Sequence, residues 1–123
     1  MEKEFVTYEQ ALALKELGFD EPCWGYCDSN REFQFFADIR VCNTNSEFRF
    51  YPTTPTFSQA FRWFRDKHDL LSWIEDHTET NFIYEIRPHI LSHYTRGEKY
   101  AFKTYEEAES TCLDKLIEII KTK

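Results

Sequence analysis

Two cysteines and two histidines form the clearest metal-ligand pattern in this sequence. Cys23 and Cys27 are separated by three residues, and His89 and His93 have the same separation. Protein zinc sites use four nitrogen or sulfur ligands in a tetrahedron. Cysteines four apart on an extended strand have Cα atoms ~13 Å apart, so Gly25 would have to bend the chain sharply. These four residues are a weak zinc candidate, and we expect no metal or cofactor.

The histidine at the end of a predicted helix is the candidate for acid–base chemistry. His68 is followed by Asp69, which could orient the imidazole as a general base. A solvated helix end is the more ordinary role for such a histidine, because an imidazolium also suits the negative end of the helix dipole. The glycines are isolated, so they form no phosphate-binding loop. Enzymatic activity therefore stays open but disfavoured.

A small basic and aromatic cluster on the same predicted helix is the candidate binding surface. Arg62, Arg65 and Lys67 surround Trp63, and Trp and Arg are the residue types that dominate interface hot spots. An exposed Trp63 together with Phe36 would form a contact surface. In the alternative, helices cover both faces of the sheet and every aromatic side chain is internal.

The charge balance favours a protein partner over nucleic acid. The chain has 22 acidic and 15 basic side chains, a formal net charge of −7, and a field of that sign repels phosphate backbones. The leading hypothesis is an accessory or protein-binding module without catalysis. The alternative is a nucleic-acid-associated factor that stacks single-stranded bases on Trp63 beside Arg62 and Lys67. A metal-dependent enzyme is the third possibility.

Three short stretches share the chemistry of a helix start. In each, a threonine is followed three residues later by Gln or Glu and then by Ala. The hydroxyl can accept from an amide one turn into the helix, while the longer side chain reaches back to the cap. The pattern predicts N-caps at Thr7, Thr56 and Thr104. Apolar residues at helical spacing follow each cap, and Gly18 is a typical end for the first helix.

Alternating apolar residues between these helices predict strands. Segments 23–27, 33–41 and 48–50 predict a three-stranded meander, and segment 82–86 predicts a further strand. Residues 71–74 suit either a strand or a helix tail, and residues 90–103 suit a hairpin that turns at 95–98. The predicted fold is α+β, with three helices packed on a mostly antiparallel sheet in the order α-βββ-α-ββ(β)-α.

The three predicted caps are nearly equally spaced along the chain, which is a pattern that an internal duplication would produce. We expect one domain, 1–123, in which residues 5–53 and 54–103 would be duplicated halves and helix 104–121 would close the fold. Independent helices that share capping chemistry are the favoured alternative.

Parts of the sequence resemble an uncharacterised family of short proteins encoded by bacteriophages and prophages of gut bacteria. The similar stretches are LKELGFDEPCWGY (14–26), TPTFSQAFRWFRDKHDLL (54–71) and FKTYEEAESTCLDKLIEII (102–120). The resemblance implies a phage origin and a bacterial cytosolic setting. It implies no activity and no catalytic residue, because the family has none assigned.

The lack of a recognisable targeting signal predicts a cytoplasmic location. The N-terminus lacks a basic region followed by an apolar stretch, and no apolar run approaches the ~20 residues of a membrane span. We therefore expect reduced cysteines that pack as small apolar side chains, no membrane partner, and an open sheet edge that could pair two copies.

Overall fold

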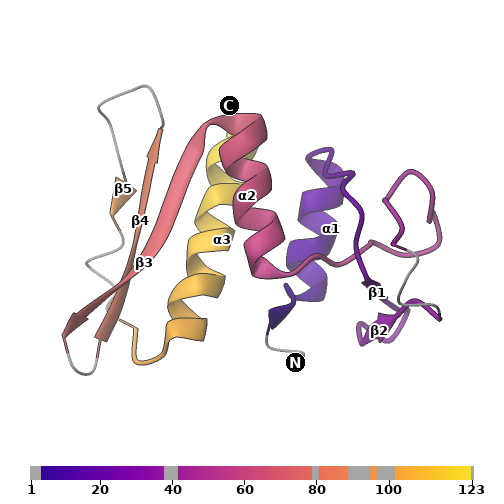
Figure 1. Ribbon diagram of the computed structural model, residues 1–123, viewed down its shortest axis with the longest axis horizontal. Helices are drawn as coiled ribbons and strands as arrows, with labels where there is room; N and C mark the ends of the chain where they lie inside the picture. Colours follow the sequence, from indigo (N-terminus) through magenta and orange to yellow (C-terminus); the bar gives the residue numbers. More distant parts are fainter. Residues whose placement is uncertain (1–3, 38–41, 79–80, 89–94, 97–101, 123) are drawn as a thin grey trace. The chain divides into compact units, whose positions relative to one another are not determined.

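The computed structural model describes residues 4–37, 42–78, 81–88, 95–96 and 102–122. The chain divides into two compact units, unit 1 (1–59) and unit 2 (60–123). The helices and strands of the described residues are α1 (Tyr8–Glu16), β1 (Gly25–Cys27), β2 (Phe33–Phe35), α2 (Phe57–His68), β3 (Leu70–Thr78), β4 (Asn81–Pro88), β5 (Thr95–Arg96) and α3 (Tyr105–Lys121) (Figure 1). The α+β class is confirmed, and the alternation of helices with groups of strands agrees with the predicted order, except that two strands follow α1 where three were predicted.

Helix α1 begins and ends where the sequence predicts. Thr7 and Gln10 form a complete capping box, because the Thr7 hydroxyl accepts from the Gln10 amide at 3.2 Å and the Gln10 side chain accepts from the Thr7 amide at 2.9 Å. At the other end, Gly18 has φ 98°. The Phe19 amide donates to the Leu14 carbonyl and the Gly18 amide to that of Lys15. This is a Schellman motif, in which glycine takes the left-handed position without steric cost.

The other two predicted caps are also confirmed. The Gln59 amide donates to the Thr56 hydroxyl at 3.1 Å, and the Thr56 amide donates back to the Gln59 side chain at 2.9 Å. The Glu107 amide donates to the Thr104 hydroxyl at 3.1 Å. Each contact joins residues three apart, so it forms as soon as the helix does.

Unit 1 contains a short antiparallel hairpin, β1–β2, in which Tyr26 lies opposite Gln34. The connecting loop turns at Asp28, whose side-chain oxygen accepts from the amides of Asn30 and Glu32. Arg31 in this loop has φ 64°. The Asp28 amide donates to the Glu32 carbonyl, so the hairpin loop proper is 29–31. The last residue of a three-residue hairpin loop has a left-handed backbone, and in this protein that residue is Arg31.

Unit 2 contains the antiparallel sheet β3-β4-β5. Helix α3 packs on β3 and β4, as Figure 1 shows. Its buried face carries residues at helical spacing, namely Ala108, Cys112, Leu113, Leu116 and Ile117. Tyr105, which the same spacing placed on this face, is exposed. Residues 71–74, which suited either a strand or a helix tail, belong to β3, and the strand predicted at 82–86 is the middle of β4.

Two details of the predicted sheet are wrong. The strands form two small sheets instead of one. The third strand of the first meander is absent from the described residues, because 45–47 form a turn and Phe48 and Phe50 lie outside any strand. Only an isolated bridge, Tyr26 to Thr53, joins the following segment to β1. Most of the predicted hairpin at 90–103 lies outside the described residues. The predicted turn at 95–98 is wrong in part, because Thr95 and Arg96 form β5 and pair with β4.

Among the described residues, no helix combines the length and the apolar character that a membrane span requires.

Candidate functional site

The predicted binding surface on α2 lacks an exposed indole. Trp63 is only 6% exposed, and its ring lies 5.0 Å from that of Phe64 and 4.8 Å from the imidazole of His68. Trp63 follows the fully buried Ala60 by three residues, so it joins the buried stripe of the helix. The prediction of an exposed Trp63 is therefore wrong. The three-residue spacing between Ala60 and Trp63 could have indicated that Trp63 is buried.

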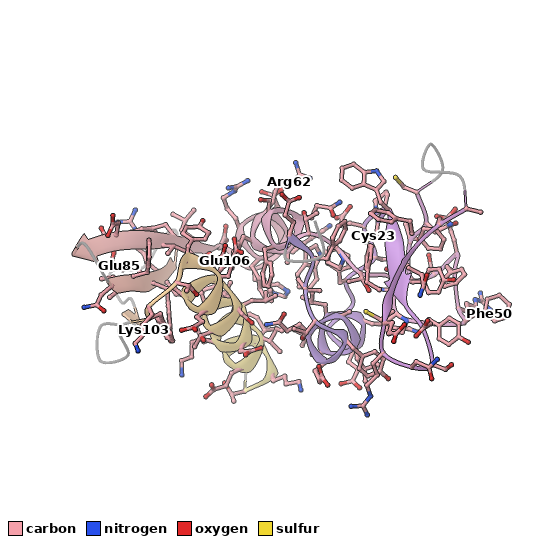
Figure 2. All side chains as sticks on the ribbon, turned by 90° about the horizontal axis from the view of Figure 1, so that it is seen from below. Cys23, Phe50, Arg62, Glu85, Lys103 and Glu106 are labelled. Atoms are coloured by element: carbon pink, nitrogen blue, oxygen red, sulfur yellow. The ribbon has the colours of Figure 1, made fainter. Side chains whose placement is uncertain are left out.

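The basic side chains of α2 do reach solvent. Arg62 and Lys67 are exposed, as is Arg65, which forms a surface ion pair with Asp66 at 3.7 Å. Figure 2 shows Arg62 projecting from the helix. Without an accessible indole between them, these cations lack the stacking platform that single-stranded nucleic acid uses. Phe36, the other predicted contact residue, belongs to unit 1.

The structure describes only two of the four residues in the weak zinc candidate. Cys23 and Cys27 are buried and free, whereas His89 and His93 lie outside the described residues. The Cys23 thiol donates to the Glu21 carbonyl at 3.4 Å, and the Cys27 sulfur accepts from the Thr54 hydroxyl at 3.4 Å. Within the described ranges, no three His, Cys, Asp or Glu side chains are grouped so that they could hold a metal ion.

Burial keeps the interior thiols protonated. Desolvation raises the pKa of Cys23 to about 12 and that of Cys112 to about 12, and it also raises the pKa of Cys27. A thiolate is the nucleophilic and metal-binding form of cysteine. At neutral pH these three side chains therefore act as small apolar groups, as the sequence analysis predicts for a reduced protein.

The raised pKa of Cys112 predicts a loss of stability in alkaline solution. The folded thiol stays protonated to about pH 12, whereas the unfolded thiol ionises above about pH 8.5. The stabilisation is complete below the unfolded pKa and falls as pH rises, by about 1.4 kcal/mol per pH unit. We expect Cys112→Ser to make the slope of unfolding free energy against pH shallower by about that amount between pH 9 and 11.

Urea unfolding across this pH range measures that slope. Leu113→Ala is the control, because it removes packing from the same helix without removing a titratable group. It should lower the unfolding free energy at every pH and leave the slope unchanged. Equal slopes for wild type and Cys112→Ser would contradict the burial argument.

The predicted contact residue Phe36 belongs to a connected group of aromatic rings. The ring of Tyr26 lies 5.2 Å from Phe36, 4.9 Å from Phe48 and 5.6 Å from Tyr51, with the two tyrosine rings nearly parallel at 10°. The rings of Phe48 and Phe50 lie 5.6 Å apart. We refer to Tyr26, Phe36, Phe48, Phe50 and Tyr51 as the aromatic surface.

The outermost ring of the aromatic surface is almost completely accessible. Phe50 is 82% exposed, and Figure 2 shows its side chain pointing away from the ribbon. Tyr26 points to the opposite side of the β1–β2 sheet from the buried Gly25 and Cys27, because side chains alternate along a strand. The sequence placed Phe36 and, less favoured than burial, Tyr26 on the outer strand face, but it did not indicate Phe48, Phe50 or Tyr51. The group joins segments up to 25 residues apart.

Comparison of the chain with protein-family models, with curated proteins and with solved structures finds no match.

Proposed function

We propose that this protein is a protein-binding module whose aromatic surface contacts a partner. The observation that carries the proposal is Phe50, which is 82% exposed and contacts the ring of Phe48, the member of the aromatic surface that links it to the others. Isolated exposed apolar residues are common, but Phe50 continues a group of half-buried rings, and contiguous apolar surface is typical of interaction sites. Phenylalanine and tyrosine are also enriched in the buried centre of protein interfaces.

The charge of unit 1 favours a basic partner. Residues 1–59 contain ten acidic and five basic side chains. Complementary potentials accelerate association and select partners by charge. Aromatic faces add to this preference, because they attract Lys and Arg cations. The proposed partner is therefore a protein with a basic segment that also carries apolar side chains.

The biological setting belongs to the same proposal. The resemblance to short phage and prophage proteins suggests an accessory role in the bacterial cytosol, where a host or phage protein would be the partner. The absence of an accessible indole on α2 weakens the alternative of nucleic-acid binding, since only Arg62, Arg65 and Lys67 remain there.

Phe50→Ser should remove most of the affinity for this partner without unfolding the protein. Truncating a central aromatic contact costs about 2 kcal/mol or more, which is about a 30-fold loss of affinity. Because Phe50 is exposed, the free energy of unfolding should change by less than about 0.5 kcal/mol. The measurement is affinity capture from bacterial lysate, followed by calorimetry with the purified partner at two salt concentrations.

Tyr105→Ser is the matched control, because Tyr105 is 46% exposed but lies in unit 2. It should recover the same partner as wild type, and binding should weaken as salt rises. Recovery of the same proteins with Phe50→Ser would contradict the proposal. So would a wild-type dimer in sedimentation that Phe50→Ser dissociates, since the contacted protein would then be another copy.

A further inference from the structure

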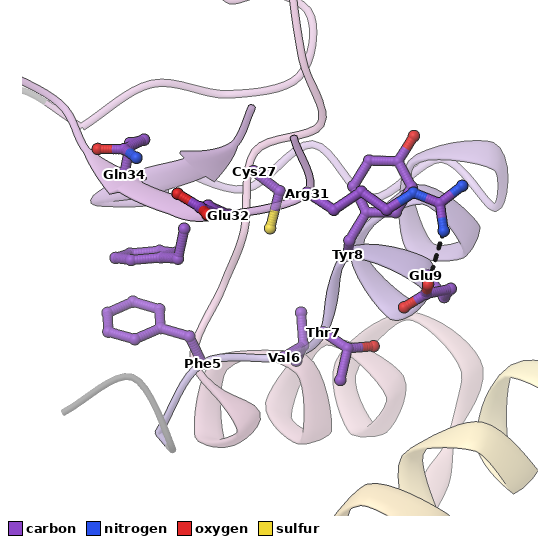
Figure 3. Close-up of a pocket in the computed structure, with 10 residues that line it drawn as sticks. Phe5, Val6, Thr7, Tyr8, Glu9, Cys27, Arg31, Glu32 and Gln34 are labelled. Carbon is purple, nitrogen blue, oxygen red and sulfur yellow. Dashed lines mark hydrogen bonds and ion pairs between the residues drawn. The ribbon is translucent and has the colours of Figure 1, made fainter. Parts of the chain in front are cut away.

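An open cavity in unit 1 lies beside the start of α1 and the β1–β2 hairpin (Figure 3). Its volume is about 860 Å³, which is within the range of sites that bind small molecules. Three nearly inaccessible side chains line its interior, with Phe5 6%, Val6 4% and Cys27 2% exposed. None of these carries a charge at neutral pH, because burial raises the pKa of the Cys27 thiol.

One wall of the cavity is aromatic. The rings of Phe5 and Phe33 lie 4.2 Å apart at an angle of 32°, and Phe35 meets Phe33 edge to face at 4.9 Å. Phe33 is only half-buried, so part of this wall is open to a ligand. An aromatic face both packs against apolar groups and attracts cations.

Arg31, the one arginine among the described residues of the rim, is already engaged. The Arg31 guanidinium lies 3.4 Å from a carboxylate oxygen of Glu9 and 5.0 Å above the ring of Tyr8, and Figure 3 shows this pair at one end of the cavity. The left-handed backbone of Arg31, which is uncommon for a residue other than glycine, carries the side chain there. An anionic ligand would have to break this arrangement.

The other end of the rim offers hydrogen-bond acceptors. The Glu32 carboxylate forms no hydrogen bond or ion pair with another described residue, although its backbone is fixed by the bond from its amide to Asp28. The Gln34 side chain lies on the other face of β2, opposite Tyr26, and donates to Asp28 at 3.2 Å. Among the described residues of the lining, Glu9 and Glu32 together with Arg31 leave one net negative charge.

From this lining we infer that the cavity binds a small organic cation, an ammonium group attached to an aromatic or other apolar body. The apolar body would pack against Phe5 and Phe33, and the ammonium would donate to the Glu32 carboxylate. Charge-assisted hydrogen bonds of this kind are shorter and stronger than neutral ones. Because the lining shares no residue with the aromatic surface, this inference is independent of the proposed function.

Three probes of similar size separate charge from shape. Phenethylamine is cationic, 2-phenylethanol is neutral and phenylacetate is anionic. For a ligand with so few atoms we expect a Kd of about 1 mM for phenethylamine, weaker binding of the alcohol, and no detectable binding of phenylacetate. Titration followed by ¹H–¹⁵N NMR measures the affinity, and the shifted amides should be those of the cavity lining.

Glu32→Gln tests the carboxylate, because it keeps the shape of the side chain and removes its charge. It should weaken phenethylamine binding about tenfold. Glu16→Gln, on the exposed end of α1 and outside the lining, should leave the Kd unchanged. Equal affinity for phenethylamine and phenylacetate, an unchanged Kd in Glu32→Gln, or shifts that map outside the lining would each overturn the inference. Phe50→Ser should bind phenethylamine as wild type does, whether or not the proposed protein partner is correct.

Discussion

Replacing Gly25 with Ala is expected to destabilise unit 1 by about 3 kcal/mol. A Cβ atom at this position would lie 2.4 Å from the Phe33 ring and 2.5 Å from the Gln34 carbonyl oxygen. The ring can turn aside by rotation, but the carbonyl belongs to the backbone of β2. Strand β1 would therefore have to separate from β2, and the Gly25 carbonyl would be displaced from the Thr54 amide, which donates to it at 2.8 Å.

Hydrogen exchange measures this effect locally, because amides in the β1–β2 hairpin should exchange faster than in wild type while those of α3 do not. Thermal unfolding gives the accompanying loss of stability. Phenethylamine binding should also be lost, since Phe33 and Gln34 line the cavity.

Gly18→Ala is the matched control, because its added methyl group would meet no atom within 4 Å. Its cost comes only from the backbone, where φ is 98°, and should be about 1 kcal/mol. Equal losses for the two variants would show that the close approach of the strands is not the cause. Wild-type exchange rates in Gly25→Ala would show that β1 and β2 are not paired as described.

Replacing Leu116 with Ala is expected to cost about 2–5 kcal/mol of unfolding free energy. Leu116 is completely buried on the face of α3 that packs on β3 and β4. Truncation removes apolar contacts and leaves a space that the surrounding helix and sheet fill only in part. Because the native state of a small protein is stable by only about 5–15 kcal/mol, this change removes a large share of the total.

Urea unfolding followed by circular dichroism at 222 nm measures the loss. Glu118→Ala is the control, because Glu118 is exposed on the same helix and its ion pair with Lys115, at 3.4 Å, lies at the surface. Such pairs contribute less than about 1 kcal/mol, so this variant should remain close to wild type. A loss below about 1 kcal/mol for Leu116→Ala would mean that α3 does not pack on the sheet through this residue.

The sequence alone determined where each helix begins, and it located α1, α2 and α3 through Thr7, Thr56 and Thr104. These predictions succeed because a capping box is a local structure. Its hydrogen bonds join residues three apart, and their geometry depends little on the rest of the chain. The Schellman end at Gly18 and the buried face of α3 succeed for the same reason, since helical periodicity is itself local.

Only the tertiary structure decided which aromatic side chains reach solvent. Trp63 is buried, whereas Phe50 is exposed beside Phe48, whose ring also contacts Tyr26. The cavity likewise depends on Phe5 meeting Phe33, a contact between residues 28 positions apart. Contacts between residues so far apart in the sequence depend on how the strands pair. The local sequence around an aromatic residue does not indicate which distant residue it will contact. The predicted single sheet failed for that reason, while the helix caps did not.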